Sequence, residues 1–534
     1  MSSSKEQQRP KEIISTLKSL IDKWMNIGIS IRVGNTDVPP INPHYLSFIF
    51  KEGTIFSREI INGSIFGSDI DEDYFNGYNC RVLMGDALQG YGESRVADTD
   101  LSELIENWKI DGYLDVALKQ AFHNYTKCIG VNVLFKNHSI DFTKLSEEAI
   151  DKYLVEFKKP KFDDFSSTDL LLDWSNELSK LSFIKDASAI IANSYKNNFF
   201  VDSEGREIAM QNIFNRLVYQ FEVWHKSNIG IDFLDSFLLN PKISKQELES
   251  KLQESFSIAE SLRTADTILT GDYPVIWDHT TTGTTAHEAF AAHLISAKYL
   301  MNGASTIYED KLNKKILPDF FTVIDDPTLI NGYGSFLYDD EGIKAKKIVL
   351  VENGILKNYL YDRASAKYFG KHSNGKSRMQ GVTIEDENGK DSVNNPEPRV
   401  TNLEILSSNK IPDEQVFETM KKYCKDHHKE FGIYIEAGNG HVIPITGEVR
   451  IFPQRGWKIY PDGRKKEITN FFFVGHQNIL NKVQVTGDTY EIAYGHCGAE
   501  SGYVPTQNKA PICFLPKLHL IAGKKTRLTK RLDE

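Results

Sequence analysis

A pair of strand-type segments joined by a tight turn sets the strongest limit on how this chain can fold. Residues 186–224 contain two such segments on either side of the turn Asp202 to Gly205. Strands joined by a short turn pair antiparallel. Residues 45–97 show a similar pattern, with a turn around Asn62-Gly63. The sequence therefore predicts an antiparallel sheet assembled from neighbouring segments.

Apolar residues recur at helical spacing between and around these strands. Residues 11–27 predict an amphipathic helix, and residues 99–123 predict another. Residues 145–182 indicate two helices split by a polar stretch, and residues 244–270 a long helix with Ser244 as its N-cap. Predicted helices and predicted strands therefore both occur in the first half of the chain.

The pattern changes after Gly271, where a short strand and a Thr/Gly stretch lead into a helix expected over residues 285–301. The rest of the chain is mostly strand-and-turn sequence, with a polar loop expected over 373–400. A length of 534 residues suggests roughly two to four domains. We therefore place a domain boundary near residue 270, between an N-terminal domain, residues 1–270, and a C-terminal domain, residues 271–534.

Composition narrows the possible partners and compartment. Lys and Arg number 63 against 73 Asp and Glu, so the formal charge is 63 − 73 = −10, which argues against a nucleic-acid partner. The basic stretch at 524–531 is interpreted as a solvated tail. No signal peptide or bilayer-spanning run is found. Five cysteines without a C-x-x-C pair indicate a reduced, cytoplasmic protein with no membrane partner.

The segment TTGTTAHEAFAAHL carries the strongest chemical signal. His287 and Glu288 are adjacent and His293 follows, a combination typical of metal hydrolases, in which imidazole binds Zn²⁺ and the carboxylate takes a proton from water. In a regular α-helix, however, position i+6 lies roughly 240° around the axis, so His293 would face away from His287. Alternatively, Thr285 to Glu288 is simply a helix-capping box.

A second candidate lies in the segment EIAYGHCGAESGYVP. Cys497 lies between Gly495 and Gly498, with His496 beside it, and a thiolate from a distant segment is a common zinc ligand. The alternative is a buried structural cysteine, an interpretation adopted for the other cysteines: Cys80, Cys128, Cys424 and Cys513.

An acidic group, Asp339, Asp340 and Glu341, follows a turn-rich stretch. Clustered carboxylates can bind a cation or raise one another's pKa. More often such a group is a solvated turn, and both interpretations stay open.

Several segments in order resemble the TldD/PmbA family of metallopeptidases. In the second half these are PVIWD, TAHEAFAAHL, FTVIDDPTL, YDDEG, VLVENGILKNYLYD, PEPRVTN and YGHCGAESGYVP. The first half is a looser match. The resemblance implies an α+β fold of two domains. An N-terminal α+β domain, residues 1–270, packs over a C-terminal, mostly antiparallel β domain, residues 271–534, that carries the active site. The resemblance also implies a homodimer, or a heterodimer with a related family member.

The resemblance further implies one zinc ion per chain, held by two histidines of an H-E-x-x-x-H helix and by a cysteine near the C-terminus. His287, Glu288 and Cys497 match that pattern, with Glu288 as catalytic base, whereas Ala292 occupies the second histidine's place. We expect His293 to complete the set through a π-bulge in the helix. If the helix stays regular, His496 is the alternative ligand.

The implied function is a zinc-dependent peptidase acting on unfolded peptides or peptide precursors, which bind by strand addition to a sheet edge. The alternative is a catalytically silent, PmbA-like peptide-binding subunit of a heteromeric protease. Retention of His287, Glu288 and Cys497 favours the enzyme, and Ala292 favours the silent subunit.

Overall fold

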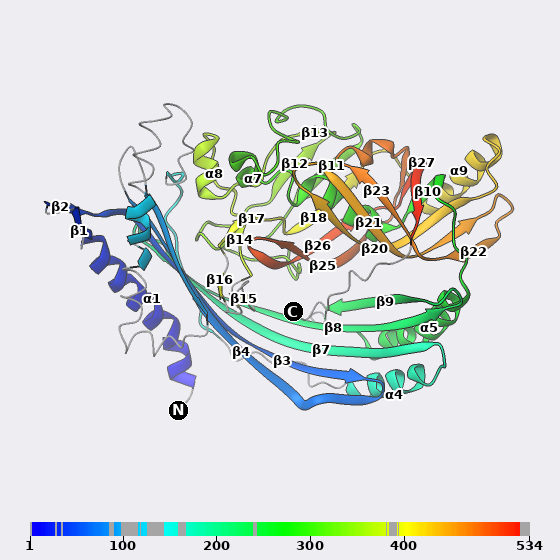
Figure 1. Ribbon diagram of the computed structural model, residues 1–534, viewed down its shortest axis with the longest axis horizontal. Coiled ribbons are helices and arrows are strands. Elements are labelled where there is room, and N and C mark those ends of the chain that lie inside the picture. The colour runs from blue at the N-terminus through cyan, green and yellow to red at the C-terminus, as the bar shows by residue number, and fades with distance from the viewer. Residues whose placement is uncertain are drawn as a thin grey trace.

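The computed structural model describes residues 3–26, 29–33, 36–84, 90–97, 116–117, 119–124, 144–157, 167–238, 243–380, 382–383, 392–393 and 395–523. It is an α+β fold with two β-rich regions (Figure 1). Long curved strands of the N-terminal half extend beneath a more compact set of shorter strands from the C-terminal half (Figure 1).

The elements of the N-terminal half are α1 (Ser3–Asn26), β1 (Ile29–Val33), β2 (Thr36–Ile41), β3 (Pro43–Ile61), β4 (Ser64–Met84), β5 (Gly90–Ala97), β6 (Lys152–Leu154), α4 (Thr168–Ser179), β7 (Ile184–Asp202), β8 (Glu207–His225), β9 (Ile229–Leu238) and α5 (Lys245–Thr264). The main sheet has the order β5-β4-β3-β7-β8-β6, with β9 also paired to β8. Its two long hairpins are β3–β4 and β7–β8, which confirms the antiparallel pattern predicted from the sequence.

Tight turns hold these hairpins in register. Asn62 and Gly63 have φ of 47° and 78°, the left-handed conformations that a two-residue hairpin turn requires. At the β7–β8 turn, the carboxylate of Asp202 accepts hydrogen bonds from the backbone N–H groups of Glu204, Gly205 and Arg206. The turn is thus fixed by its own side chain as well as by strand pairing.

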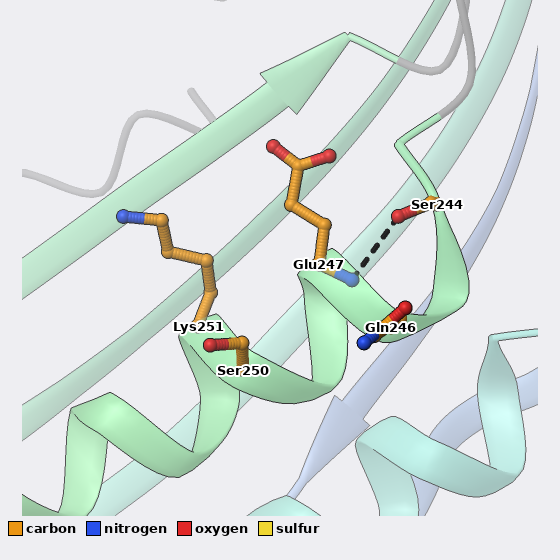
Figure 2. Close-up of a pocket in the computed structure, with 5 residues that line it drawn as sticks. All are labelled: Ser244, Gln246, Glu247, Ser250 and Lys251. Atoms are coloured by element: carbon orange, nitrogen blue, oxygen red, sulfur yellow. Dashed lines mark hydrogen bonds between the residues drawn. The ribbon is translucent and has the colours of Figure 1, made fainter.

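Helices cover the apolar side of the sheet. α1 buries Ile13, Ile14, Leu17 and Ile21 against β3 and β7, as its amphipathic spacing predicted. α4 and α5 bury Leu171, Trp174 and Leu252, among others, against β7, β8 and β9. Ser244 caps α5 by accepting a hydrogen bond of 3.1 Å from the backbone N–H of Glu247 (Figure 2). That helix ends at Thr264, six residues before its predicted end.

Residues 145–157 are not the helix that the sequence predicted. They are extended and contain the short strand β6. Arg206 donates to the carbonyls of Glu148 and Ala149, and Arg363 donates to that of Ser146. These tertiary bonds occupy carbonyl groups that a helix would use internally. β9 had no predicted counterpart, and the helix expected over 99–123 lies largely outside the described residues.

The elements of the C-terminal half are β10 (Gly271–Trp277), α6 (His279–Ala286), η1 (His287–Ala291), α7 (Ala297–Asn302), β11 (Phe321–Asp325), β12 (Ile348–Glu352), β13 (Ile355–Leu356), α8 (Arg363–Tyr368), β14 (Ser377–Arg378), β15 (Val382–Thr383), β16 (Ser392–Val393), β17 (Glu397–Pro398), β18 (Asn402–Ser407), β19 (Lys410–Ile411), α9 (Asp413–Asp426), β20 (Gly432–Ile443), β21 (Glu448–Ile459), β22 (Lys465–Ile468), β23 (Phe471–His476), η2 (Ile479–Lys482), β24 (Val485–Gly487), β25 (Glu491–Ala499), β26 (Gly502–Ala510) and β27 (Cys513–Ala522).

Most of these strands form two sheets around one large apolar core. The larger sheet has the order β10-β20-β21-β23-β27-β24-β19, and β10 pairs also with β27, so part of it closes on itself. The smaller sheet has the order β13-β12-β11-β18-β26-β25, which leaves β25 with one partner strand among those described. Most pairings are antiparallel, as predicted.

Two further expectations need correction. The described part of the 373–400 segment is not only loop, because β14 pairs with β17 and β15 with β16. The helix expected over 285–301 begins earlier, at His279, and is interrupted before α7. Among the described helices, none combines the length and apolarity that a membrane crossing requires.

Candidate metallopeptidase site

The segment with His287 and Glu288 lies in the contact zone between the two C-terminal sheets. α6 packs against β20, β25 and β26. Asp278 caps it by accepting a hydrogen bond of 2.7 Å from the N–H of Thr281. A Cβ on Gly283 would lie 2.8 Å from the Cβ of Asn508, so glycine permits this close approach to β26. Because the helix begins at His279, Thr285 is internal, and the capping-box interpretation is wrong.

The helix leaves α geometry at His287. Residues 287–291 form a π-turn, η1, in which the N–H of Ala292 donates to the carbonyl of His287 at 2.9 Å. This confirms the predicted departure from a regular helix. The side chains of Ala289, Phe290 and Ala291 are buried in the main core, so tertiary packing fixes the widened turn.

Around the buried thiol of Cys497, the structure brings together the residues that the sequence had selected. The Nε2 atom of His293 lies 3.9 Å from the Sγ atom of Cys497, which extends from β25. The charge of His287 also acts on this thiol, and the Nδ1 atom of His287 lies 3.3 Å from the Oδ1 atom of Asn508. His293 also stacks on Tyr299, with ring centroids 5.9 Å apart. Both histidines therefore face Cys497 despite their unusual spacing.

Electrostatics favour a thiolate at this position. Burial alone would raise the pKa of Cys497, but the charges of Arg399, His287 and His293 hold it well below its ordinary value. Burial alone would lower the pKa of His287, but the charge and hydrogen bond of Cys497 raise it to about 9. A thiolate between cationic groups has the electrostatic character of a metal ligand.

Glu288 lies beside this group on the π-turn. Burial raises the pKa of its carboxyl group, and the nearby charges of His287 and His293 oppose that rise. The backbone of β20 passes close by, since a Cβ on Gly440 would lie 3.2 Å from the Cγ atom of Glu288. Glycine at this point permits the close approach of the β20 backbone to the Glu288 side chain.

His496, the alternative ligand, is directed elsewhere. Its Nε2 atom lies 3.1 Å from the hydroxyl of Tyr333, and its Nδ1 atom lies 3.4 Å from Arg216 on β8. Burial, together with the charges of Arg216 and Arg378, lowers its pKa to about 4. Successive residues of a strand point to opposite faces, which separates His496 from Cys497.

Two supporting residues were not identified from the sequence. Arg399 donates to the backbone carbonyl of Cys497, to the hydroxyl of Ser501 at 2.6 Å and to the carbonyl of Gly502 at 2.9 Å. Asn508 orients His287 from β26. Arg399 lies in the PEPRVTN segment, but nothing local in that segment indicates a contact with a cysteine 98 residues away.

The acidic group at 339–341 is not the solvated turn that such sequences usually form. Asp339 and Glu341 are buried, and the group forms ion pairs with the N-terminal sheet: Lys51 with Asp340 at 2.7 Å and Arg81 with Glu341 at 2.6 Å. Burial, and then the charge of Glu341, raises the pKa of Asp339 well above its ordinary value, as the alternative interpretation anticipated. These contacts join the two halves of the molecule.

The remaining cysteines agree with the structural interpretation where they can be placed. Cys80, Cys424 and Cys513 are buried, and Cys128 lies outside the described residues, as does the basic stretch at 524–531. Burial raises the pKa of Cys513 to about 12, opposite in direction to the shift of Cys497.

Within the described part of the chain, no three His, Cys, Asp or Glu side chains lie close enough together to coordinate one metal ion. The donors around Cys497 nevertheless have the right chemistry, because two imidazoles and a thiolate suit zinc. The 3.9 Å separation of His293 and Cys497 is the observation on which that fit depends.

Comparison with known proteins supports the family resemblance. Residues 270–511 match the PmbA/TldA metallopeptidase C-terminal domain. A metalloprotease of Archaeoglobus fulgidus is 30% identical over 266 residues, which cover 49% of this chain and 56% of that protein. A zinc metalloprotease TldD homolog of Saccharolobus solfataricus is 26% identical over 250 residues, covering 46% and 51%. The matched stretches span about half the length of these relatives.

Two solved structures share the fold over most of the chain. A putative modulator of a DNA gyrase from Thermotoga maritima has a TM-score of 0.62 and 16% identity, covering 89% of this chain and 96% of that one. TldE from Thermococcus kodakarensis has a TM-score of 0.60 and 15% identity, covering 95% and 100%. At these identities the likeness concerns the fold alone.

Proposed function

We propose that this protein is a zinc-dependent peptidase that hydrolyses unfolded peptides or peptide precursors. The observation that carries the proposal is the π-turn at His287–Ala291, after which His293 lies against the thiol of Cys497. A buried thiolate, two imidazoles and an adjacent carboxylate form a compact catalytic set. The names of the metalloprotease relatives support the same activity.

Each residue has a distinct role in the proposed reaction. His287, His293 and Cys497 would hold one zinc ion, which would supply Lewis acidity to the scissile carbonyl and to the attacking water. Glu288 accepts a proton from that water and returns it to the leaving amine, the usual work of a general base and acid. Arg399 helps to keep Cys497 ionised and holds its backbone. Asn508 orients the ring of His287.

Strand edges beside the site suit an extended substrate. β25, which carries Cys497, is the last strand of its sheet. β20 pairs with β10 only over 433–435, while its pairing with β21 continues to Ile443. The part of β20 near Glu288 therefore has one strand partner among the described pairings. An unfolded peptide can hydrogen-bond to such edges through its backbone, whereas a folded chain has used those groups internally.

In this proposal the N-terminal and C-terminal domains have different functions. Residues 271–534 form the catalytic domain, and residues 1–270 enclose the substrate and provide dimer contacts. The partner is an identical chain or a related family member. Buried cysteines accord with a reduced, cytoplasmic setting.

A silent peptide-binding subunit is the second candidate, and one observation favours it. No three ligand side chains in the described residues are closed around a single point. In that case His293 and Cys497 would form only a buried polar pair, and the strand edges would bind peptide without cleaving it.

Zinc content and cleavage measured on the same purified protein separate the two candidates. The peptidase predicts about one zinc per chain and hydrolysis of a permanently unfolded protein, with loss of activity on chelation. Glu288→Gln should keep zinc and fold but lower cleavage by roughly 10²–10⁴-fold, the usual contribution of a general base. Glu309→Gln, at an exposed glutamate, is the matched control. Absence of zinc, or unchanged turnover in Glu288→Gln, would contradict the proposed role.

A further inference from the structure

A small cavity lies where the N-terminal sheet meets the C-terminal strands. Its volume is about 70 Å³. Its walls come from β3, β7 and β8 on one side and from the segments at 335–340, 377–380 and 503–505 on the other. The lining residues that matter here are Lys51, Lys196, Asn198, Asp339, Asp340, Ser377, Arg378 and Val504.

Positive charge exceeds negative charge in this cavity. Lys51 forms an ion pair of 2.7 Å with Asp340 and donates to the carbonyl of Met379 at 3.1 Å. Lys196 donates to the carbonyl of Gln380, which is a neutral partner. Arg378 donates to two more neutral groups, the carbonyls of Val400 at 2.7 Å and Pro505 at 2.9 Å. Asp340 is thus the carboxylate that faces all three cations.

Asp339 does not restore the balance. Its carboxyl group accepts backbone hydrogen bonds from Glu341, Ile343 and Ser377. Burial raises its pKa well above the ordinary value, with Glu341 adding to the rise, which favours the uncharged form. Burial, and then the charge of Lys51, lowers the pKa of Lys196 well below its ordinary value, as expected where cations outnumber anions.

Two buried polar atoms of the lining also lack a hydrogen-bond partner among the described residues. They are the Oδ1 atom of Asn198 and the Oγ atom of Ser377. Unsatisfied buried polar groups are costly and uncommon. The hydroxyl of Ser377 can donate and so indicates a missing acceptor, whereas the amide oxygen of Asn198 only accepts and so indicates a missing donor such as water. The strand register places Asn198 directly opposite Lys51, which brings one of these atoms to the charged end of the cavity.

We propose that this cavity binds a carboxylate group carried by a peptide. A carboxylate would accept hydrogen bonds from Lys51, Lys196 and Ser377 and would balance the excess positive charge. The cavity volume of about 70 Å³ is enough for a small group such as a carboxylate. The carboxylate belongs either to the C-terminus of the peptide or to an Asp or Glu side chain.

The cavity lies one strand from the candidate catalytic centre. Val504, in its wall, is the direct cross-strand partner of Cys497. A peptide anchored here would therefore be held close to the strand that carries the thiol. The identification of the ligand as a peptide rests on the proposed function, whereas the preference for a carboxylate does not.

Peptide binding to the full-length Glu288→Gln protein tests this assignment without hydrolysis. One peptide pair has a C-terminal acid or amide, and a second, fully amidated pair has an internal Glu or Gln. We expect the acid member of one pair to bind at least about tenfold more tightly, or 1.4 kcal/mol, and the responding pair identifies the source of the carboxylate. Adding Lys196→Met should abolish the preference, whereas Lys185→Met, at an exposed lysine on the same strand, should preserve it.

A second variant covers the case in which Lys196→Met does not fold. Asn198→Asp is nearly isosteric and supplies a negative charge inside the cavity, so it should also abolish the preference for acid. The assignment is overturned if neither pair shows a preference in the parent protein, or if the preference survives in either cavity variant. An acid preference in a protein without peptidase activity would leave the cavity assignment standing and refute the proposed function.

Discussion

The backbone conformation of the N-terminal hairpins and that of the segment from His279 to Asn302 have different causes. β3–β4 and β7–β8 pair over long stretches with few irregularities, and their turns have local causes such as Asn62-Gly63. The site segment passes from α6 to the π-turn η1 and then to α7 within 24 residues. Its geometry is set by contacts with β20, β25 and β26, which are distant in sequence.

The comparison shows that the candidate site residues lie in the irregular segment and that the regular hairpins form the scaffold. A regular hairpin repeats one interaction many times, so no single side chain is critical. The π-turn directs the His293 side chain toward Cys497, and the residues packed around the turn must keep it in that conformation. π-Turns are rare and often accompany functional sites. Substitutions in the site segment should therefore alter metal binding and activity, and substitutions in the hairpins should alter stability.

The largest expected effect separates two buried cysteines of the C-terminal half. Cys497→Ala should lower zinc affinity by more than the 10–100-fold typical of an outer-shell residue and abolish cleavage, because it removes a proposed ligand. Cys513→Ala should leave both unchanged, since burial raises the pKa of that thiol and keeps it protonated. Zinc titration and cleavage assays provide the measurement. Equal zinc affinity and equal cleavage in the two variants would show that Cys497 is not a zinc ligand.

The second prediction tests whether the π-turn serves the metal. His293→Ala should lose bound zinc, whereas His496→Ala should retain it, because His496 contacts Tyr333 and Arg216 instead. Metal analysis of both variants at matched protein concentration checks this. Zinc retained in His293→Ala and lost in His496→Ala would reverse the assignment.

Sequence patterns predicted regular elements well and failed where distant residues intervene. The β7–β8 pair follows from its strand pattern and turn. The extended structure of residues 145–157 could not be predicted from the local sequence pattern. The arginines that donate to the carbonyl groups of this segment lie about 50 to 220 residues away in sequence.

The candidate site shows the same limit. His287, Glu288 and Cys497 could be selected from local segments and a family resemblance. Arg399 and Asn508 could not, because they meet Cys497 and His287 across 98 and 221 residues. The acidic group at 339–341 was also ambiguous, since its cationic partners lie in the N-terminal sheet. No local pattern specifies which charge a turn will meet.

The third prediction concerns substrate form and tests whether the strand edges near the site are functional. One protein offered in its native state and in a permanently unfolded state should be cleaved at least about tenfold faster when unfolded, because only the unfolded chain has free backbone groups for β25 and β20. Peptide mapping of both reactions gives the rates. Similar rates for the two forms would exclude recognition through strand addition.

The smallest expected effect compares two glycines with positive φ, one in each region. Gly63, in the β3–β4 turn, has φ of 78°, and an added Cβ would lie 2.5 Å from the Cβ of Asn176. Gly303, which ends α7, has φ of 74°, and an added Cβ would have no heavy atom within 4 Å. Gly303→Ala should therefore cost only the left-handed strain, about 1 kcal/mol of unfolding free energy, whereas Gly63→Ala should cost about 3 kcal/mol because steric overlap is added. Chemical denaturation measures both values, and zinc content should be unchanged in Gly63→Ala. Equal losses would mean that α4 moves away from the turn at little cost, and that the hairpin is less tightly packed than its regular pairing indicates.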